Sequence, residues 1–211
     1  FLLFSHNTIH DPLLEDSALV AKYKQKPGAK QPENHPVVGA MIETLDKSVG
    51  RVMEKINTLG LRQNTVFIFY SDNGGKAAYA KQKPLRKGKG WLYEGGIRVP
   101  LIIRWPGVVE PGSQSSELVS SIDLYPTWLD MIQSDQSCAC DGISLLPVLK
   151  QTGTLNRETL YWHYPHYHRG SGMVPAGAIR KGKFKLIEWY EPFMAGEKGA
   201  RTTRQTTVEN V

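Results

Sequence analysis

Residues 66–100, VFIFYSDNGGKAAYAKQKPLRKGKGWLYEGGIRVP, decide the fold class of this chain. The segment opens with five apolar residues, 66–70, that run without alternation, which is typical of a strand buried on both faces of a parallel sheet. A long helix is expected before it, at 36–60, because apolar residues recur there every three or four positions. A second buried strand is predicted at 99–105. Helix followed by buried strand indicates α/β layering.

Shorter elements are predicted on either side of this segment. The apolar start of the chain, residues 1–5, predicts a strand entered midway. The charged stretch 13–35 contains several turn-forming residues and predicts a surface connection. A short helix is expected at 121–132, SIDLYPTWLDMI. No internal repeat is found.

The last part of the chain has a different sequence pattern. From Thr159 onward, short aromatic stretches alternate in polarity, which predicts a small antiparallel sheet with a tight turn at 181–182. The polar, turn-rich stretch 150–158 marks a boundary. We therefore expect two domains, 1–155 and 156–211.

Composition limits the function classes only in part. With 211 residues, 40% of them apolar, the chain can bury a core. Its net charge is +6, and the six Lys and Arg residues between positions 76 and 89, with no acid among them, can supply that excess. A basic balance favours an anionic partner, but nucleic acid, acidic glycan and a small oxyanion all satisfy it. No stretch of eighteen apolar residues is present, so no membrane partner is expected.

Two further features concern the cysteines and the first residue. Cys138 and Cys140 are the only cysteines, and a separation of two positions is poor geometry for a structural disulfide. No second cysteine pair completes a zinc site. The chain begins at Phe1 rather than Met, so we expect a fragment of a longer protein.

Asp72 and Asn73 are candidate metal ligands. They follow the predicted strand, and ligands of open α/β sheets bind beyond the carboxyl ends of the strands. A carboxylate and an amide carbonyl are hard oxygen donors that suit calcium or magnesium. The alternative is an ordinary turn, since Asp, Asn and Gly are common turn formers.

Lys89 is a candidate anion ligand. It lies between Gly88 and Gly90, where the backbone can approach an anion closely, and its ammonium could neutralise negative charge that develops on a bound oxyanion. The alternative is a solvated basic loop. Glu94 is expected to hold Arg98 or the loop rather than to react.

Taken together, several motifs resemble one family. SDNGG, GKGWLYEGGIRVPLIIRWPG, SSIDLYPTWLDM and DGISLLPVL occur in the order and spacing of the C-terminal half of a type I sulfatase, in the alkaline-phosphatase-like superfamily. SHNTIHDPL is similar to that family's histidine-bearing segment, and LYWHYPHY with AIRKGKFKLIEWYE is similar to its small C-terminal sheet. The resemblance implies an α/β fold: part of a mostly parallel sheet flanked by helices, plus a small antiparallel C-terminal subdomain. It extends to about residue 191.

The resemblance also implies roles for single residues. Asp72 and Asn73 match the second pair of ligands of a divalent cation, usually calcium, that holds the sulfate ester oxygens. Lys89 matches the lysine that contacts the sulfate. His10 matches the histidine on the leaving-group side, where a departing alkoxide needs a proton. From chemistry alone, a single histidine before Asp-Pro is more often a loop hydrogen-bonder.

His163 and His166 match no catalytic motif. We interpret them as substrate-side contacts, and the alternative is that they pack against the small sheet.

The chain departs from the family pattern in three places. The family's nucleophile is a formylglycine made within a C/S-x-P-x-R motif, and these 211 residues contain no such motif. The first pair of acidic metal ligands is also missing. The end of the chain, 196–211, does not continue as the family does, which leaves the last helix and strand without a prediction.

The function implied is sulfuric ester hydrolysis on an aryl or carbohydrate sulfate, with calcium and formylglycine as cofactors. The expected partners are a sulfated small molecule or glycan and the N-terminal half of the same protein, with no nucleic acid and no membrane. By resemblance, we expect a secreted or periplasmic location. Alone, the chain is expected to be inactive, because it lacks the nucleophile.

Three alternatives remain open. One is a phosphoesterase or phosphonate hydrolase of the same superfamily, which uses similar ligands. Another is a noncatalytic remnant that binds anions or glycans. The last is a basic nucleic-acid module in which Trp91 and Tyr93 stack on bases. It ranks lowest, because its basic residues lie on a single loop.

Overall fold

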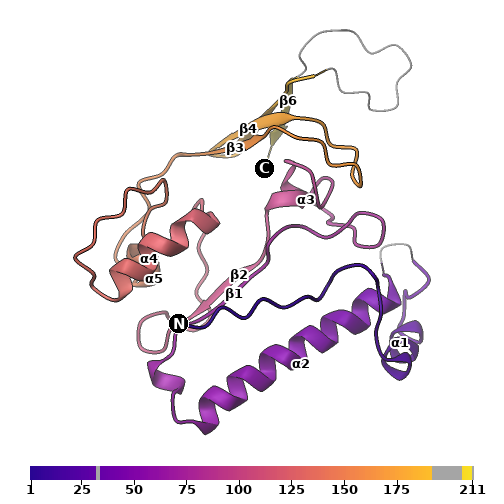
Figure 1. Cartoon of the computed structure of the whole chain (residues 1–211), viewed down its shortest axis with the longest axis horizontal. Coiled ribbons are helices and arrows are strands. Elements are labelled where there is room, and N and C mark those ends of the chain that lie inside the picture. Colours follow the sequence, from indigo (N-terminus) through magenta and orange to yellow (C-terminus); the bar gives the residue numbers. More distant parts are fainter. Residues whose placement is uncertain (32–33, 192–205, 211) are drawn as a thin grey trace. The chain divides into compact units, whose positions relative to one another are not determined.

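The computed structural model describes residues 1–31, 34–191 and 206–210 (Figure 1). Its helices are α1 (Ser17–Lys24), α2 (Pro36–Thr58), α3 (Glu94–Ile97), α4 (Leu124–Met131) and α5 (Leu146–Leu149), with 3-10 turns at Arg62–Asn64 and Ser121–Asp123. Its strands are β1 (Phe67–Tyr70), β2 (Leu101–Arg104), β3 (Thr159–Tyr164), β4 (Ala176–Lys181), β5 (Phe184–Trp189) and β6 (Thr206–Asn210). Two compact units result: Phe1–Thr65 with Tyr70–Pro100, and Val66–Phe69 with Leu101–Val211.

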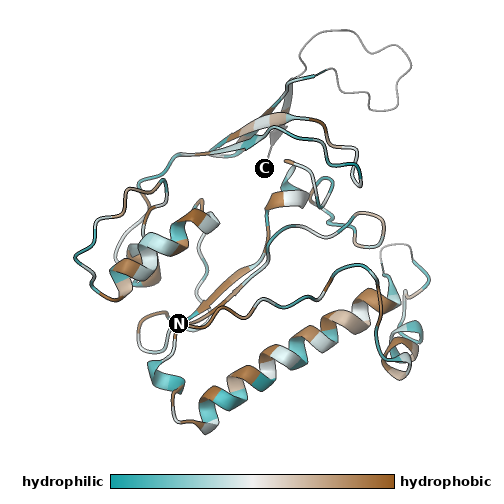
Figure 2. Cartoon of the chain, in the orientation of Figure 1, coloured by the Kyte–Doolittle hydropathy of each residue, from teal (hydrophilic) through white to brown (hydrophobic). Residues whose placement is uncertain are grey.

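Helix α2 dominates the first unit and confirms the predicted helix. Pro36 occupies its first turn, where a missing N–H costs nothing, and Gly60 follows its end with a φ of 71°. Brown apolar and teal polar residues alternate along its ribbon in Figure 2, as an amphipathic helix requires. Of the described helices, none is long and apolar enough to cross a membrane.

Helix α1 corrects the expectation of a plain surface connection over 13–35. The carboxylate of Asp16 caps it by accepting hydrogen bonds from two backbone amides of its first turn. The Lys22 ammonium then lies 2.6 Å from Glu43 of α2, and Lys47 lies 2.8 Å from the same carboxylate. These two ammonium groups, with the Tyr23 hydroxyl, lower the pKa of Glu43 to about 2. The stretch was missed because its apolar residues do not recur on one helical face, although Asp16 before Ser17 is a capping signal.

The strand predicted at residues 1–5 was wrong. Those residues belong to neither of the two sheets in the described part of the chain. The side chains of Phe1, Leu2, Leu3 and Phe4 are exposed. Apolar composition alone therefore did not place them in a strand, since a strand also needs a hydrogen-bonded neighbour.

Strands β1 and β2 confirm that the two apolar runs form strands, but the expected complete burial was wrong, since Ile102 of β2 is 62% exposed. They pair with each other in a two-stranded sheet, and the residues of β1 are all half-buried. The short helix α3, which was not predicted, precedes β2.

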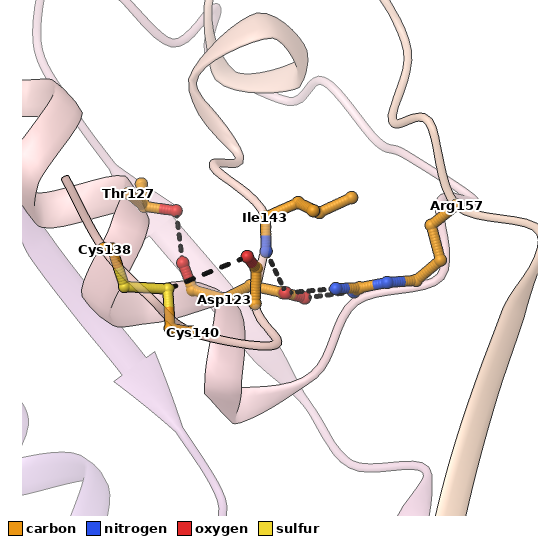
Figure 3. The surroundings of a disulfide bond; sticks show 7 residues. Asp123, Thr127, Cys138, Cys140, Ile143 and Arg157 are labelled. Atoms are coloured by element: carbon orange, nitrogen blue, oxygen red, sulfur yellow. Dashed lines mark hydrogen bonds and ion pairs between the residues drawn. A yellow bond between two sulfur atoms is a disulfide. The ribbon is translucent and has the colours of Figure 1, made fainter.

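The second unit is organised around a buried carboxylate that the sequence analysis did not single out. Asp123, which is completely buried, binds both terminal nitrogens of Arg157 at 2.5 and 2.6 Å. It also accepts hydrogen bonds from the backbone amides of Ser120 and Ile143, at 2.8 and 2.9 Å. Figure 3 shows Asp123 between Ile143 and Arg157. Beside it, Leu145, Leu149 and Leu155 form a small apolar core.

A disulfide joins Cys138 to Cys140, so the expectation against one was wrong (Figure 3). Their Cα atoms lie 5.2 Å apart, which is within the range that a disulfide spans. The local turn therefore brings the two side chains together despite the short sequence separation.

Strands β3 to β6 form a four-stranded antiparallel sheet in chain order, which confirms the small C-terminal sheet. Lys181 pairs with Phe184 across the predicted tight turn, where Gly182 has a φ of 54°. The domain limits at 155 and 156 stay a prediction. Of the chain end for which no prediction was made, 196–211, residues 196–205 and 211 lie outside the described residues.

Candidate functional site

The loop after β1 presents Asp72 and Asn73 directly beyond the strand end. One carboxylate oxygen of Asp72 accepts the backbone N–H of Asn73 at 2.9 Å, and the Ser71 hydroxyl donates to the carbonyl of Asn73 at 3.2 Å. The Asp72 side chain is exposed, and that of Asn73 is half-buried. Asp72 and Asn73 therefore form a bend, and the Asp72 carboxylate is exposed to solvent.

Glycines allow the backbone of this turn to contact the backbone at Gly88 and at 95–96 directly. The N–H of Gly74 donates to the carbonyl of Gly96 at 2.9 Å. A Cβ on Gly74 would lie 1.8 Å from the carbonyl oxygen of Gly95, and one on Gly88 would lie 2.3 Å from the carbonyl oxygen of Gly75. Side chains at these positions are excluded because the backbones are in direct contact.

Lys89 is held on the same loop. Its backbone N–H donates to the carbonyl of Gly75 at 2.9 Å, two residues after Asn73. Trp91, two residues further on, donates its backbone N–H to the carbonyl of Gly88 at 3.2 Å. The structure therefore holds the backbone of Lys89 next to the segment that carries Asp72 and Asn73.

Glu94 and Arg98 close the far end of this loop. Glu94 is buried, with 3% of its surface exposed, and its carboxylate lies 4.0 Å from the Arg98 guanidinium. The N–H of Arg98 donates to the carbonyl of Glu94 at 2.8 Å. These contacts support the expectation that Glu94 has a structural role.

An ion pair ties the histidine-bearing segment to the loop. The Lys76 ammonium lies 2.6 Å from the Asp11 carboxylate, across 65 positions of sequence. This contact, together with a hydrogen bond from Tyr79, lowers the pKa of Asp11, and Asp11 in turn raises the pKa of Lys76. Burial, followed by the charge of Asp11, raises the pKa of Tyr79. Asp11 thus anchors its neighbour His10 to the chain just after Gly75.

His10 itself is exposed, and its Nδ1 lies 3.0 Å from the carbonyl oxygen of Asp11. A carbonyl can only accept, so this contact assigns the hydrogen to Nδ1 and leaves Nε2 for another group. The ring is therefore oriented by its own backbone, with one nitrogen available for proton transfer.

His163 and His166 belong to the second unit. Nδ1 of His163 lies 2.9 Å from the Tyr190 hydroxyl, and the His166 ring centroid lies 3.9 Å from that of Tyr164. Both histidines are exposed. These contacts are the packing that the alternative interpretation described, and they leave the rings accessible to a ligand.

The residues present fit a divalent cation only in part. Asp72 and Asn73 offer hard oxygen donors of the kind that calcium binds, but calcium takes six to eight oxygens. Within residues 1–31, 34–191 and 206–210, no group of three or more His, Cys, Asp or Glu residues could hold a metal ion. A complete site would need ligands from elsewhere.

The buried aromatic residues remove the basis for a nucleic-acid module. Trp91 is 7% exposed and Tyr93 is 3% exposed, so neither ring face is available to stack on a base. The cations Lys87 and Arg86 lie over these rings instead. Two features of the site were therefore missed from the sequence: this aromatic support and the Asp11–Lys76 tether.

Known protein families show to which class the chain belongs. A family model described as "Sulfatase" matches residues 1–134, and a model described as "N-sulphoglucosamine sulphohydrolase, C-terminal" matches residues 87–198. The chain therefore belongs to the sulfatase family, in the alkaline-phosphatase-like superfamily.

Individual relatives agree with the family models. The chain is 35% identical to a sulfatase from Formosa agariphila in an alignment that covers 79% of this chain and 33% of that protein. It is 33% identical to human arylsulfatase A in an alignment that covers 88% of this chain and 38% of that protein. The crystal structure of Ps i-CgsB in complex with k-i-k-neocarrahexaose superposes with a TM-score of 0.75 at 27% identity, covering 95% of this chain and 41% of the other. The chain thus spans little more than a third of the length of these relatives.

Proposed function

We propose that this chain supplies the metal-binding and leaving-group side of a sulfuric ester hydrolase that removes sulfate from an aryl or carbohydrate sulfate. The observation that carries the proposal is the glycine-packed loop, in which Lys89 is hydrogen-bonded beside the segment of Asp72 and Asn73. Membership of the sulfatase family gives this juxtaposition its chemical interpretation.

Asp72 and Asn73 are the residues that would hold calcium. The ion would polarise the oxygens of the sulfate and offset their charge. The Asp72 carboxylate suits this role because it is exposed and its hydrogen bond with the Asn73 amide fixes its direction. The remaining oxygen ligands would come from a segment outside these 211 residues or from water.

Lys89 and His10 would act on the ester itself. The Lys89 ammonium would bind a sulfate oxygen and offset the negative charge that grows during transfer. As the bond between sulfur and the ester oxygen breaks, a protonated His10 would donate the Nε2 proton to the departing oxygen and become neutral. The contact between Nδ1 and the Asp11 carbonyl would hold the ring in the required orientation.

The nucleophile is not among these residues. No C/S-x-P-x-R motif occurs in the chain, so no residue here can become the formylglycine, and no step of attack on sulfur is assigned to it. We infer that an N-terminal half carrying the motif completes the enzyme, and that the 211 residues alone do not hydrolyse sulfate esters.

His163 and His166 are proposed as contacts to the organic part of the substrate. Both are exposed and braced by tyrosines, which limits the entropy lost when a ligand binds. A saccharide is the proposed substrate class, and it is supported by the structural relative Ps i-CgsB, whose crystal structure is a complex with k-i-k-neocarrahexaose. A secreted or periplasmic location is proposed too, supported by the Cys138–Cys140 disulfide, which an oxidising compartment preserves.

The test compares leaving groups in a polypeptide that joins this chain to a segment carrying the nucleophile motif. We would measure kcat/KM for a nitrophenyl sulfate and a sugar sulfate in the unsubstituted protein, in His10→Ala and in Lys89→Ala. If these residues assist departure, both substitutions harm the sugar sulfate more, because an activated phenol leaves without a proton. Lys183→Ala, which removes an exposed lysine between β4 and β5, is the matched control.

The rival function, a noncatalytic anion binder, makes a different prediction. A loop that only attracts anions would lose similar factors for both substrates, and the losses would shrink as salt screens the charges. That result would remove His10 and Lys89 from the chemistry.

A further inference from the structure

Not every cation of the basic loop is explained by the proposed function. Lys76 pairs with Asp11, and Lys89 is assigned to the sulfate. Arg86 and Lys87 are exposed, and within the described part of the chain neither has a carboxylate partner. Two unpaired cations therefore lie two and three positions before the lysine of the candidate site.

Buried aromatic rings hold these two cations in place. The guanidinium carbon of Arg86 lies 4.1 Å from the centroid of Tyr93, and the ammonium of Lys87 lies 4.4 Å from the centroid of Trp91. The two ring centroids are themselves only 5.8 Å apart. Cation–π contacts of this length restrain side chains that would otherwise move freely in water. The rings thus present two neighbouring positive charges whose other sides face solvent.

The backbone fixes the same pair. The carbonyl of Arg86 accepts the N–H of Gly95 at 2.9 Å, and a Cβ on Gly95 would lie 2.4 Å from the carbonyl oxygens of both Arg86 and Lys87. Lys87 has a φ of 62°, in the left-handed region that glycine adopts easily and lysine does not. Backbone preference therefore does not explain a lysine at this position.

We propose that Arg86 and Lys87 form a second anion subsite, which binds another sulfate group of the same saccharide while Lys89 holds the sulfate to be removed. The proposal rests on the proposed function and adds a substrate class to it: sugars with more than one sulfate. Paired cations on the loop that carries Lys89 would select such sugars, since each added charge-assisted contact strengthens binding.

The test is an NMR titration of the full 211-residue chain with galactose 6-sulfate and with galactose 2,6-disulfate. Two equivalent sulfates alone would give the disulfate a twofold advantage, and we expect a preference of about tenfold, because one further contact to a charged group adds that order of affinity. Arg86→Ala and Lys87→Gly should reduce the preference to about twofold and leave affinity for the monosulfate unchanged. Glycine at position 87 suits the backbone, so that variant keeps the fold.

Lys89→Ala and Lys183→Ala are the positive and the negative control for loss of sulfate binding. Lys89→Ala should weaken both ligands, whereas Lys183→Ala, an equal change of net charge at a distant turn, should weaken neither. The subsite is overturned if the unsubstituted chain shows no preference beyond twofold. It is equally overturned if Arg86→Ala and Lys87→Gly weaken both ligands by the same factor, since that is general electrostatic attraction.

Failure of the subsite can be told apart from failure of the proposed function. Binding of the two sugars is measured without turnover, so it does not depend on the nucleophile. If the preference exists but a polypeptide with the nucleophile motif hydrolyses neither sugar, the proposed function is wrong and the anion subsite stands. If both sugars are hydrolysed without preference, the proposed function stands and the anion subsite is wrong.

Discussion

Asp72 and Asp123 each lie in a segment that the family motifs include, yet their surroundings are opposite. Asp123 is completely buried, and its two oxygens receive a guanidinium at 2.5 and 2.6 Å and two backbone amides at 2.8 and 2.9 Å. Asp72 is exposed, and its carboxylate receives the adjacent amide of Asn73 at 2.9 Å. A buried carboxylate with every oxygen satisfied stabilises the fold. An exposed one with an open oxygen can bind a ligand.

The basic side chains show the same contrast. Arg157 has 8% of its side chain exposed and is committed to Asp123. Arg86 lies over an aromatic ring and remains exposed. Of these two arginines, the structural one is paired and buried, whereas the one near the candidate site is held over a ring and left accessible.

The largest effect should come from Asp123. Replacing it by Ala leaves the Arg157 guanidinium buried without a counter-charge, so we expect a loss of about 3–5 kcal/mol of unfolding free energy. Asp72→Ala, the matched substitution at an exposed carboxylate, should change stability by about 0.5 kcal/mol or less. Urea unfolding of both variants measures the difference. Similar losses in the two would show that Asp72 is also structural.

A smaller effect is expected from the glycine contacts of the loop. In Gly74→Ala the new Cβ would lie 1.8 Å from a backbone oxygen, and the resulting displacement should cost about 1–3 kcal/mol. Gly50→Ala in α2 is the control, because a Cβ there meets nothing within 4 Å. Alanine within a helix should raise the unfolding free energy by about 0.5–1 kcal/mol. Hydrogen exchange of the Gly74 and Lys89 amides follows the loop directly. Unchanged protection in Gly74→Ala would contradict the close packing.

The smallest effect depends on pH. Burial alone would raise the pKa of Asp123, but Arg157 and the amides of Ile143 and Ser120 outweigh it and lower the pKa below its usual value. A lowered folded-state pKa means that the stabilisation is complete above the unfolded-state value of about 4 and is lost as pH falls through the folded-state pKa. The unsubstituted chain should therefore exceed Asp123→Asn in unfolding free energy by a constant amount above pH 4, and this difference should shrink below pH 4. A difference that grows on acidification would contradict a lowered pKa for Asp123.

Much of the fold could be predicted because its signals are local. The spacing of apolar residues placed α2, and the uninterrupted run before Ser71 placed β1. Helix α1 has a weak apolar pattern and was missed, and residues 1–5 have an apolar pattern without a neighbouring strand. Periodicity reports which face can be buried, but it does not report whether a partner is there to bury it.

The residues of the site and of the buried ion pair also differ in whether a local sequence motif predicted them. Asp72, Asn73, His10 and Lys89 were predicted through their motifs, whose order in the sequence carries the family signal. The Asp123–Arg157 pair spans 34 positions and the Lys76–Asp11 pair spans 65, so no local pattern contains either. The only local signal for Asp123 was its capping box with Ser120. Long-range pairs depend on tertiary packing, which one sequence does not state.

A calorimetric titration with Ca²⁺ tests whether Asp72 and Asn73 are one half of a metal site. We expect weak binding to the 211-residue chain, with a Kd of about 10⁻⁴–10⁻³ M, because two protein ligands leave most of the coordination to water. Binding should disappear in Asp72→Ala and persist in Asp141→Ala, a control at another exposed carboxylate. A submicromolar Kd lost in Asp72→Ala would mean that this chain holds a complete site. Binding unchanged in Asp72→Ala would mean that the ion binds elsewhere and that Asp72 only shapes its turn.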